Sequence, residues 1–146
     1  MSIRCVAPTG SLTAVPGGLS LEETRLEYQG GVLEPGHPLK LTTRKEQWAY
    51  SARIPFHIPP AGNTALYALV HARVLRGRIG IGVLDRQTKD FQSEVMVDPA
   101  PGVQDILIPV VAPNRAECLV FRSAASTGVA TSLLIEDVSL VIPTVR

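Results

Sequence analysis

Three side chains that can bind polar ligands recur at odd-numbered positions of one extended apolar segment. Tyr67, His71 and Arg73 share this alternation, so a β-strand would carry them on one face. Arginine, histidine and tyrosine donate hydrogen bonds to hydroxyl and carboxylate groups, and they offer flat surfaces to a ligand. We expect arginines from neighbouring strands to complete a ligand-binding face consisting of Arg53, Tyr67, His71, Arg73 and Arg122. The alternative is a solvated polar face without a ligand.

Trp48 is the only tryptophan, and a flat indole ring is a common stacking surface for a sugar. It shares its alternation with Tyr50, Ile54 and Phe56, which are the apolar set of this segment. The pattern therefore favours packing of Trp48 in the core, with its indole N–H bonded to a neighbour, over a role as a sugar platform.

Gly80 and Gly82 lie two residues apart in a segment that otherwise has the pattern of a strand. Glycine weakens a strand, so a pair on one face indicates that a ligand, a backbone or a large side chain approaches closely. Two interpretations stay open. A ligand approaches this face, or a neighbouring tryptophan, tyrosine or arginine covers the glycines.

The residue types that bind metals or act in catalysis do not occur in this sequence at the spacing typical of such sites. The histidines His37, His57 and His71 do not lie at metal-ligand spacing. The sequence has no GxSxG motif, and its aspartates lie in turn contexts, where aspartate is expected anyway. Glu136 and Asp137 could provide oxygen ligands to a structural calcium ion, or lie at a bulge or in solvent. We therefore expect no catalytic residues, and no metal or cofactor other than such a calcium ion.

Short apolar segments separated by turn residues about every ten positions indicate β-strands. The expected strands are Leu39–Thr43, Gln47–Ile58, Ala65–Arg76, Arg78–Arg86, Ser93–Val97, Gln104–Val110, Cys118–Ser123 and Ser132–Ile142. The best helical candidate, residues 20–28, is short, although Ser20 and Glu23 resemble a capping box. Eight or nine antiparallel strands without a convincing helix predict an all-β chain, folded as a two-sheet β-sandwich or jelly roll.

Two local irregularities are also expected. Gly77 separates two predicted strands and indicates a tight hairpin, because glycine adopts a positive φ without strain. The apolar residues of the last strand can all face the core only if a bulge lies near Glu136 and Asp137.

The length of 146 residues suits one domain. We expect an extended N-terminal arm or linker over residues 1–20 and a β-sandwich over residues 21–146. Hydrophobic residues make up 45% and charged residues 18% of the chain, which excludes a disordered tail.

Charge and the N-terminal sequence limit the expected partners and location. The 14 basic and 13 acidic residues give a net charge of +1, without the basic stripe of a nucleic-acid binder. No apolar run is long enough to span a membrane. The first residues lack the pattern of a secretory signal, so we expect a cytoplasmic protein. The spacing of Cys5 and Cys118 favours two isolated thiols over one long-range disulfide.

Five segments carry a resemblance to a known family: WAYSARIPF at 48–56, VLRGRIGIGVLD at 74–85, EVMV at 94–97, CLVFRS at 118–123 and LLIEDVSL at 133–140. Their order resembles a carbohydrate-binding-module-like jelly-roll domain, of the kind found beside bacterial glycosyltransferases and sugar-modifying methyltransferases. The resemblance implies non-catalytic binding of a saccharide or glycan on the outer face of one sheet. It also implies an accessory role beside an adjacent enzyme domain.

An alternative function is protein–protein interaction or homo-oligomeric assembly. The non-core positions of the predicted strands include the apolar residues Leu69, Leu75, Leu84 and Val120. A contiguous apolar face of this kind is typical of a surface that binds a partner.

Overall fold

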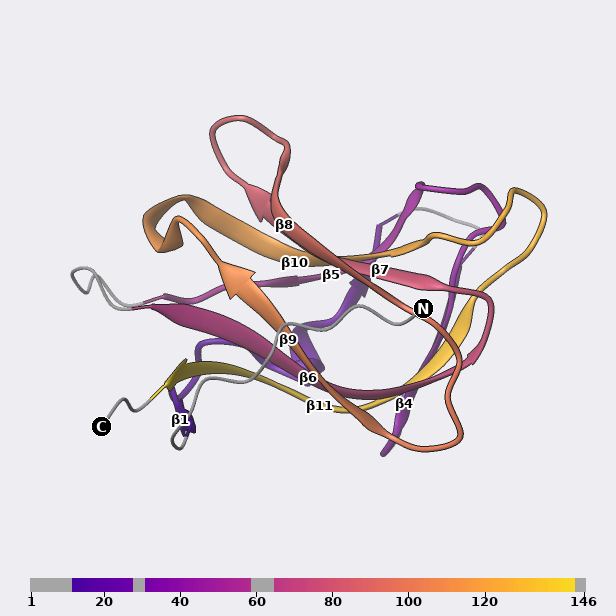
Figure 1. Cartoon of the computed structure of the whole chain (residues 1–146), viewed down its shortest axis with the longest axis horizontal. Helices are drawn as coiled ribbons and strands as arrows, with labels where there is room; N and C mark the ends of the chain where they lie inside the picture. The colour runs from indigo at the N-terminus through magenta and orange to yellow at the C-terminus, as the bar shows by residue number, and fades with distance from the viewer. Residues whose placement is uncertain (1–11, 28–30, 59–64, 144–146) are drawn as a thin grey trace.

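The computed structural model describes residues 12–27, 31–58 and 65–143, which form two antiparallel sheets packed face to face (Figure 1). The first, here called the β6 sheet, has the order β3 (Val32–Glu34), β4 (Leu39–Thr42), β11 (Ser132–Pro143), β6 (Leu66–Arg76) and β9 (Gln104–Val110), and β1 (Leu12–Ala14) pairs with β11. The second, the β10 sheet, has the order β2 (Arg25–Leu26), β5 (Tyr50–Pro55), β10 (Ala116–Ser123), β7 (Ile79–Asp85) and β8 (Phe91–Val97). Two 3₁₀ turns are also described, η1 (Leu21–Glu23) and η2 (Pro113–Arg115).

Strands β4 to β11 pass back and forth between the two sheets. β4, β6, β9 and β11 lie in the β6 sheet, and β5, β7, β8 and β10 lie in the β10 sheet. Within this series, β7 and β8 are the one consecutive pair that stays in a single sheet. Eight strands interleaved in this way form a jelly roll. The predicted all-β class and antiparallel two-sheet sandwich are confirmed.

Most predicted strands agree with the observed ones to within a few residues, and the strand Gln104–Val110 agrees in full. The segment predicted over Gln47–Ile58 is shorter in the structure, because β5 begins at Tyr50. In the helical candidate at 20–28, the η1 turn and the two-residue strand β2 take the place of a helix.

Gly77 has the expected positive φ, at 85°. It does not close a hairpin, because β6 and β7 lie in different sheets. A Cβ atom at this position would overlap Oγ1 of Thr131, so the turn also lacks room for a side chain. The hairpin prediction is wrong, and Gly77 instead lies where the chain crosses from one sheet to the other.

β11 carries the predicted bulge. Its register with β6 shifts between Ile135 and Asp137. The shift changes the alternation of the strand, so Leu133, Ile135, Val138 and Leu140 are all buried.

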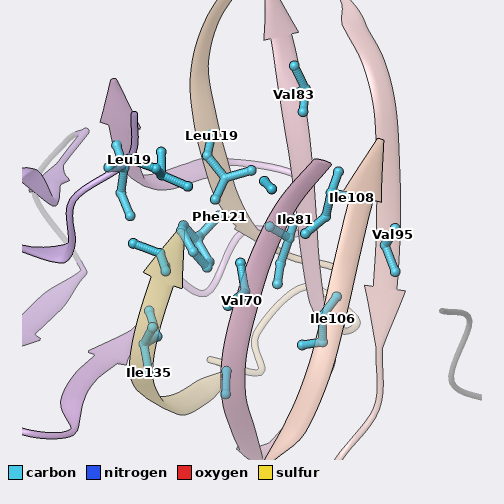
Figure 2. Close-up of a cluster of buried hydrophobic side chains, with 14 of the residues drawn as sticks. Leu19, Val70, Ile81, Val83, Val95, Ile106, Ile108, Leu119, Phe121 and Ile135 are labelled. Carbon is cyan, nitrogen blue, oxygen red and sulfur yellow. The ribbon is translucent and has the colours of Figure 1, made fainter. Parts of the chain in front are cut away.

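Apolar side chains from alternate positions of both sheets fill the space between them. Figure 2 shows side chains of β6, β9 and β11 facing side chains of β7 and β10, among them Val70, Ile106, Ile135, Ile81 and Phe121. Phe121 is fully buried. Burial of a large apolar side chain stabilises a fold by about 1.5–3 kcal/mol, so this core gives both sheets a firm support for their outer faces.

The N-terminal arm is described in part, since residues 1–11 lie outside the described residues. Leu12–Ala14 pairs with β11 as strand β1. The backbone oxygen of Gly18 accepts a hydrogen bond from the N–H of His57 at 2.9 Å, and Leu19 is buried in the core. The described part of the arm is therefore packed on the sandwich.

Asp85 fixes the hairpin between β7 and β8. Its Oδ1 accepts hydrogen bonds from the backbone N–H groups of Gln87 (2.8 Å) and Thr88 (3.1 Å). Its Oδ2 accepts from Nε2 of Gln92 and Nε of Arg115, each at 3.1 Å. These donors, led by the N–H of Thr88, lower the pKa of the Asp85 carboxyl to about 2, although burial acts in the opposite direction. The hairpin in turn sets the position of β8.

We predict that Asp85→Asn lowers the stability of the fold at neutral pH and makes that stability less dependent on pH in the acid range. The pKa in the folded state lies below the ordinary value of 3.8, so the carboxylate stabilises the fold above that value, and the contribution is lost as the pH falls towards about 2. Thermal unfolding across this range measures the effect. The Tm difference between the two proteins should be largest near neutral pH and should shrink in acid. An equal difference at every pH would contradict this role.

Candidate ligand-binding face

The structure places the five predicted binding residues on two opposite faces of the sandwich. Tyr67, His71 and Arg73 lie on the outer face of the β6 sheet. Arg53 and Arg122 lie on the outer face of the β10 sheet. The expectation of one shared face is therefore wrong. Alternation separates the core side of a strand from its outer side, but it does not tell which of two sheets the strand joins.

On the β6 sheet, the polar side chains are paired with neighbouring groups. Nδ1 of His71 lies 2.6 Å from Oδ1 of Asp105, and Nε of Arg73 donates a hydrogen bond to the backbone oxygen of Ala100 at 3.3 Å. These contacts fit the alternative of a solvated polar face. A role of Tyr67, His71 and Arg73 in binding stays a prediction.

On the β10 sheet, Trp48 is exposed and does not pack in the core. Its relative exposure is 42%, so the core prediction is wrong. The register of β5 with β10 shifts between Ala52 and Tyr50, so Tyr50, which the alternation also assigns to the core, lies on the outer face. The alternation therefore ends before Trp48, which precedes the strand. The φ of Trp48 is 70°, which is strained for a residue with a bulky side chain. A hydrogen bond from its backbone N–H to the oxygen of Ser123, at 2.8 Å, helps to hold this conformation.

The guanidinium group of Arg122 lies among three aromatic rings. Its Cζ is 4.5 Å from the ring centroid of Phe91, 4.8 Å from that of Trp48 and 5.9 Å from that of Tyr50. A cation at such distances is attracted by the electrons of each ring face. The three rings come from the segment before β5, from β5 itself and from β8, so Arg122 joins parts of the sheet that are distant in sequence.

Glu94 pairs with Arg122 through two hydrogen bonds. Nε of Arg122 donates to Oε2 and Nη2 donates to Oε1, each at 2.6 Å. The side chains of Arg122 and Glu94 are only 18% and 13% exposed. A two-pronged, charge-assisted pair of this kind fixes the plane of the guanidinium group. We call Trp48, Tyr50, Phe91, Glu94 and Arg122 the Arg122 cluster.

Gly80 and Gly82 allow the side chains of β8 to reach this cluster. A Cβ atom on Gly80 would lie 2.6 Å from Oε2 of Glu94, and one on Gly82 would lie 2.7 Å from Cδ1 of Phe91. Both side chains therefore cross β7 over its glycines and meet Arg122 on β10. Of the two interpretations of the glycine pair, the structure supports coverage by side chains, although these are Phe91 and Glu94 and not tryptophan, tyrosine or arginine.

Sequence reasoning thus missed Phe91 and Glu94 as members of the site. The signal that could have found them is the glycine pair. Only a short turn separates the expected strands Arg78–Arg86 and Ser93–Val97, so the second strand can pair beside Gly80 and Gly82, and its large side chains are the nearest candidates to cover them.

A small apolar cluster lies under the aromatic rings of this face. Leu84, Cys118 and Val120 are buried, and Tyr50 and Phe91 pack against them. The rings of Tyr50 and Phe91 are 5.6 Å apart and inclined by 45°. Burial is the main cause that raises the pKa of the Tyr50 hydroxyl above its usual value.

The four apolar residues of the alternative assembly surface are not contiguous. Leu84 and Val120 lie under this chain's own aromatic rings, whereas Leu69 and Leu75 lie on β6 in the other sheet. These four residues therefore do not form the contiguous apolar surface that the assembly alternative requires.

Arg53 lies further along β5 on the same face as Arg122. Its Nε is 3.0 Å from Oε2 of Glu27 in an ion pair. Its neighbour across the ladder is Val120 of β10, and the neighbour of Arg122 is Tyr50. The outer face of the β10 sheet therefore brings together two of the five predicted residues, Arg53 and Arg122.

The part of the chain that the structure describes contains no group of three or more His, Cys, Asp or Glu side chains arranged to hold a metal ion. Glu136 and Asp137, the calcium candidates, lie at the bulge of β11, where Asp137 faces His71 across the ladder. Over the same described ranges, no helix is long and apolar enough to cross a membrane.

The chain folds as a jelly-roll β-sandwich, and this fold is similar to the folds of solved carbohydrate-binding modules. A Clostridium thermocellum endo-1,4-beta-D-xylanase 10B structure with CBM22-1 and GH10 modules matches 84% of this chain at a TM-score of 0.58 and 11% identity, and the match spans 27% of that chain. A mutant of the family 29 module CBM29-2 has a TM-score of 0.58 and 13% identity over 89% of this chain and 91% of its own. A family 29 module from Piromyces equi has a TM-score of 0.57 and 6% identity over 91% of both chains.

At these identities, the likeness establishes a shared fold. No protein-family model matches the sequence, and no curated protein matches it.

We predict that Gly82→Ala destabilises the fold and disturbs the Arg122 cluster. The added methyl group would overlap the ring of Phe91 and approach the backbone oxygen of Ser93, and such overpacking typically costs about 1–3 kcal/mol. Denaturant unfolding measures the loss, and the fluorescence of the single tryptophan reports on the cluster. Gly102→Ala is the matched control, because a Cβ atom at Gly102 meets nothing within 4 Å. Equal unfolding and fluorescence in the two variants would contradict the prediction.

Proposed function

We propose that this chain is a non-catalytic glycan-binding module and that the Arg122 cluster holds a sugar ring. The observation that carries the proposal is the exposed indole of Trp48, which a strained backbone and the guanidinium group of Arg122 hold in one orientation. Strained residues of this kind concentrate at functional sites. A fixed ring loses little conformational freedom on binding, which favours affinity.

The chemistry of the cluster suits a polyhydroxylated ligand with an apolar face. The indole ring offers a flat surface to the C–H groups of a pyranose. Glu94 accepts hydrogen bonds from two N–H groups of Arg122, and a guanidinium group has five, so donors remain for sugar hydroxyls. The carboxylate of Glu94 balances the positive charge, and the cluster therefore recognises hydroxyl groups without requiring an acidic sugar.

The structural neighbours support the same class of ligand. The xylanase 10B structure is a complex with xylohexaose, and a CBM29-2 mutant is described in complex with cellulohexaose. In the xylanase, a carbohydrate-binding module accompanies a catalytic module in one chain. We infer a similar accessory role for this chain, beside an enzyme domain that acts on carbohydrate.

We predict that Trp48→Ala lowers glycan affinity at least about tenfold, which corresponds to about 1.4 kcal/mol. A glycan array identifies ligands of the unaltered protein, and isothermal titration measures their affinity for the variant. Tyr67→Ala is the matched control, because it removes an aromatic ring from the β6 sheet.

Two results would contradict the proposal. One is the absence of binding to any sugar at millimolar concentration. The other is a loss of binding in Tyr67→Ala with full affinity in Trp48→Ala, which would move the site to the β6 sheet.

A further inference from the structure

We propose that a hollow between β2, β5 and β10 is a second sugar subsite, in which Glu27 and Arg53 bind neighbouring hydroxyl groups of one sugar unit. The inference rests on the proposed function and adds to it. It assigns sugar binding to a second site on the same sheet face as the Arg122 cluster. It also predicts that the module binds an oligosaccharide of several sugar units.

The hollow has the size and lining of a small-molecule site. Its volume is about 400 Å³, within the range of typical ligand pockets. Leu26, Pro55 and Cys118 contribute apolar surface. The charged lining residues are Glu27 and Arg53, together with Glu23, Arg25 and Glu117. A sugar ring combines apolar C–H surfaces with hydroxyl groups at its edge, and this lining is complementary to both.

Glu27 carries an acceptor that the protein does not fully satisfy. Its side chain is only 15% exposed, and its Oε2 is buried without a hydrogen-bond donor in bonding geometry. Arg53 Nε lies 3.0 Å from this oxygen, so the charge is balanced while the hydrogen bond is missing. A buried polar atom without its hydrogen bond costs about 1–3 kcal/mol. Oε2 is covered by the protein in this structure, so a ligand hydroxyl that donates to it would recover that energy once the side chain of Arg53 moves aside.

Arg53 supplies the complementary donor. Its side chain is 49% exposed, so N–H groups beyond the contact with Glu27 can reach a ligand in the hollow. A carboxylate accepts and a guanidinium donates. Two neighbouring sugar hydroxyls can bind the carboxylate and the guanidinium group at once, because each hydroxyl is both a donor and an acceptor. The Glu27–Arg53 pair is therefore suited to a vicinal diol.

Cys118 forms part of the floor and does not introduce reactivity. Burial is the main cause that raises the pKa of its thiol to about 11. The thiol is therefore neutral at physiological pH, and only the thiolate is a strong nucleophile. The hollow binds without forming a covalent bond.

The hollow and the Arg122 cluster lie along one face and can contact one ligand. Tyr50 of the cluster and Arg53 of the hollow lie opposite Arg122 and Val120, which are two residues apart in β10, or about 7 Å along a strand. A single sugar ring at Trp48 does not extend over this distance. An oligosaccharide does, so affinity should increase once the chain is long enough to fill both places.

The test is isothermal titration of four probes: cellulohexaose, xylohexaose, cellobiose and xylobiose. Glu27→Gln keeps the shape of the side chain and removes its charge, and Arg53→Met removes the donors. We expect each substitution to lower the affinity for a hexasaccharide ligand about tenfold. The affinity for the disaccharide of the same sugar should stay unchanged. Trp48→Ala should weaken both lengths. Glu34→Gln is the matched control, because Glu34 pairs with Lys40 on the β6 sheet.

The possible results separate the two proposals. Unchanged hexasaccharide affinity in both Glu27→Gln and Arg53→Met, with a loss in Trp48→Ala, would overturn the second subsite and leave the proposed function intact. An equal loss for both lengths in the hollow variants would also overturn it. No binding of any of the four probes to the unaltered protein would overturn the second subsite, whereas the proposed function fails only when no sugar of the glycan array binds. Thermal unfolding of each variant shows that it is folded before its affinity is compared.

Discussion

The outer face of the β10 sheet depends on the pair between Arg122 and Glu94. The two residues lie on β10 and β8, with β7 between them, and their contact requires the glycines of β7. Removal of one partner would leave the other charge largely buried and unpaired, which is strongly destabilising. The same guanidinium group lies against Trp48, Tyr50 and Phe91. One ion pair thus lies against the three aromatic rings of the Arg122 cluster and restricts where they can lie.

The fold could be predicted from the sequence because, along each strand of a β-sandwich, apolar residues that face the core alternate with residues that face outward. The strands, the two-sheet architecture and the bulge of β11 all follow from which apolar residues must be buried together. The site was less predictable, because alternation says nothing of how strands are distributed between sheets. Arg53 and Arg122 share a face, while Tyr67, His71 and Arg73 do not join them.

Trp48 shows a second limit of the same reasoning. The register shift between Ala52 and Tyr50 already places Tyr50 on the outer face, and a positive φ at Trp48, just before the strand, turns the indole outward as well. A local backbone conformation of a non-glycine residue is set by surrounding contacts and leaves no pattern in the sequence. The glycine pair did leave a pattern, since it marked the place where Phe91 and Glu94 cross β7.

The most direct test of the account is a two-dimensional NMR titration of the protein with cellulohexaose or xylohexaose. The account predicts that the indole N–H of Trp48 and the Nε–H of Arg122 shift together with the backbone signals of β5, β8 and β10. The signals of Tyr67, His71 and Arg73 should stay in place. Shifts confined to the β6 sheet, with the Trp48 and Arg122 signals unchanged, would contradict the account.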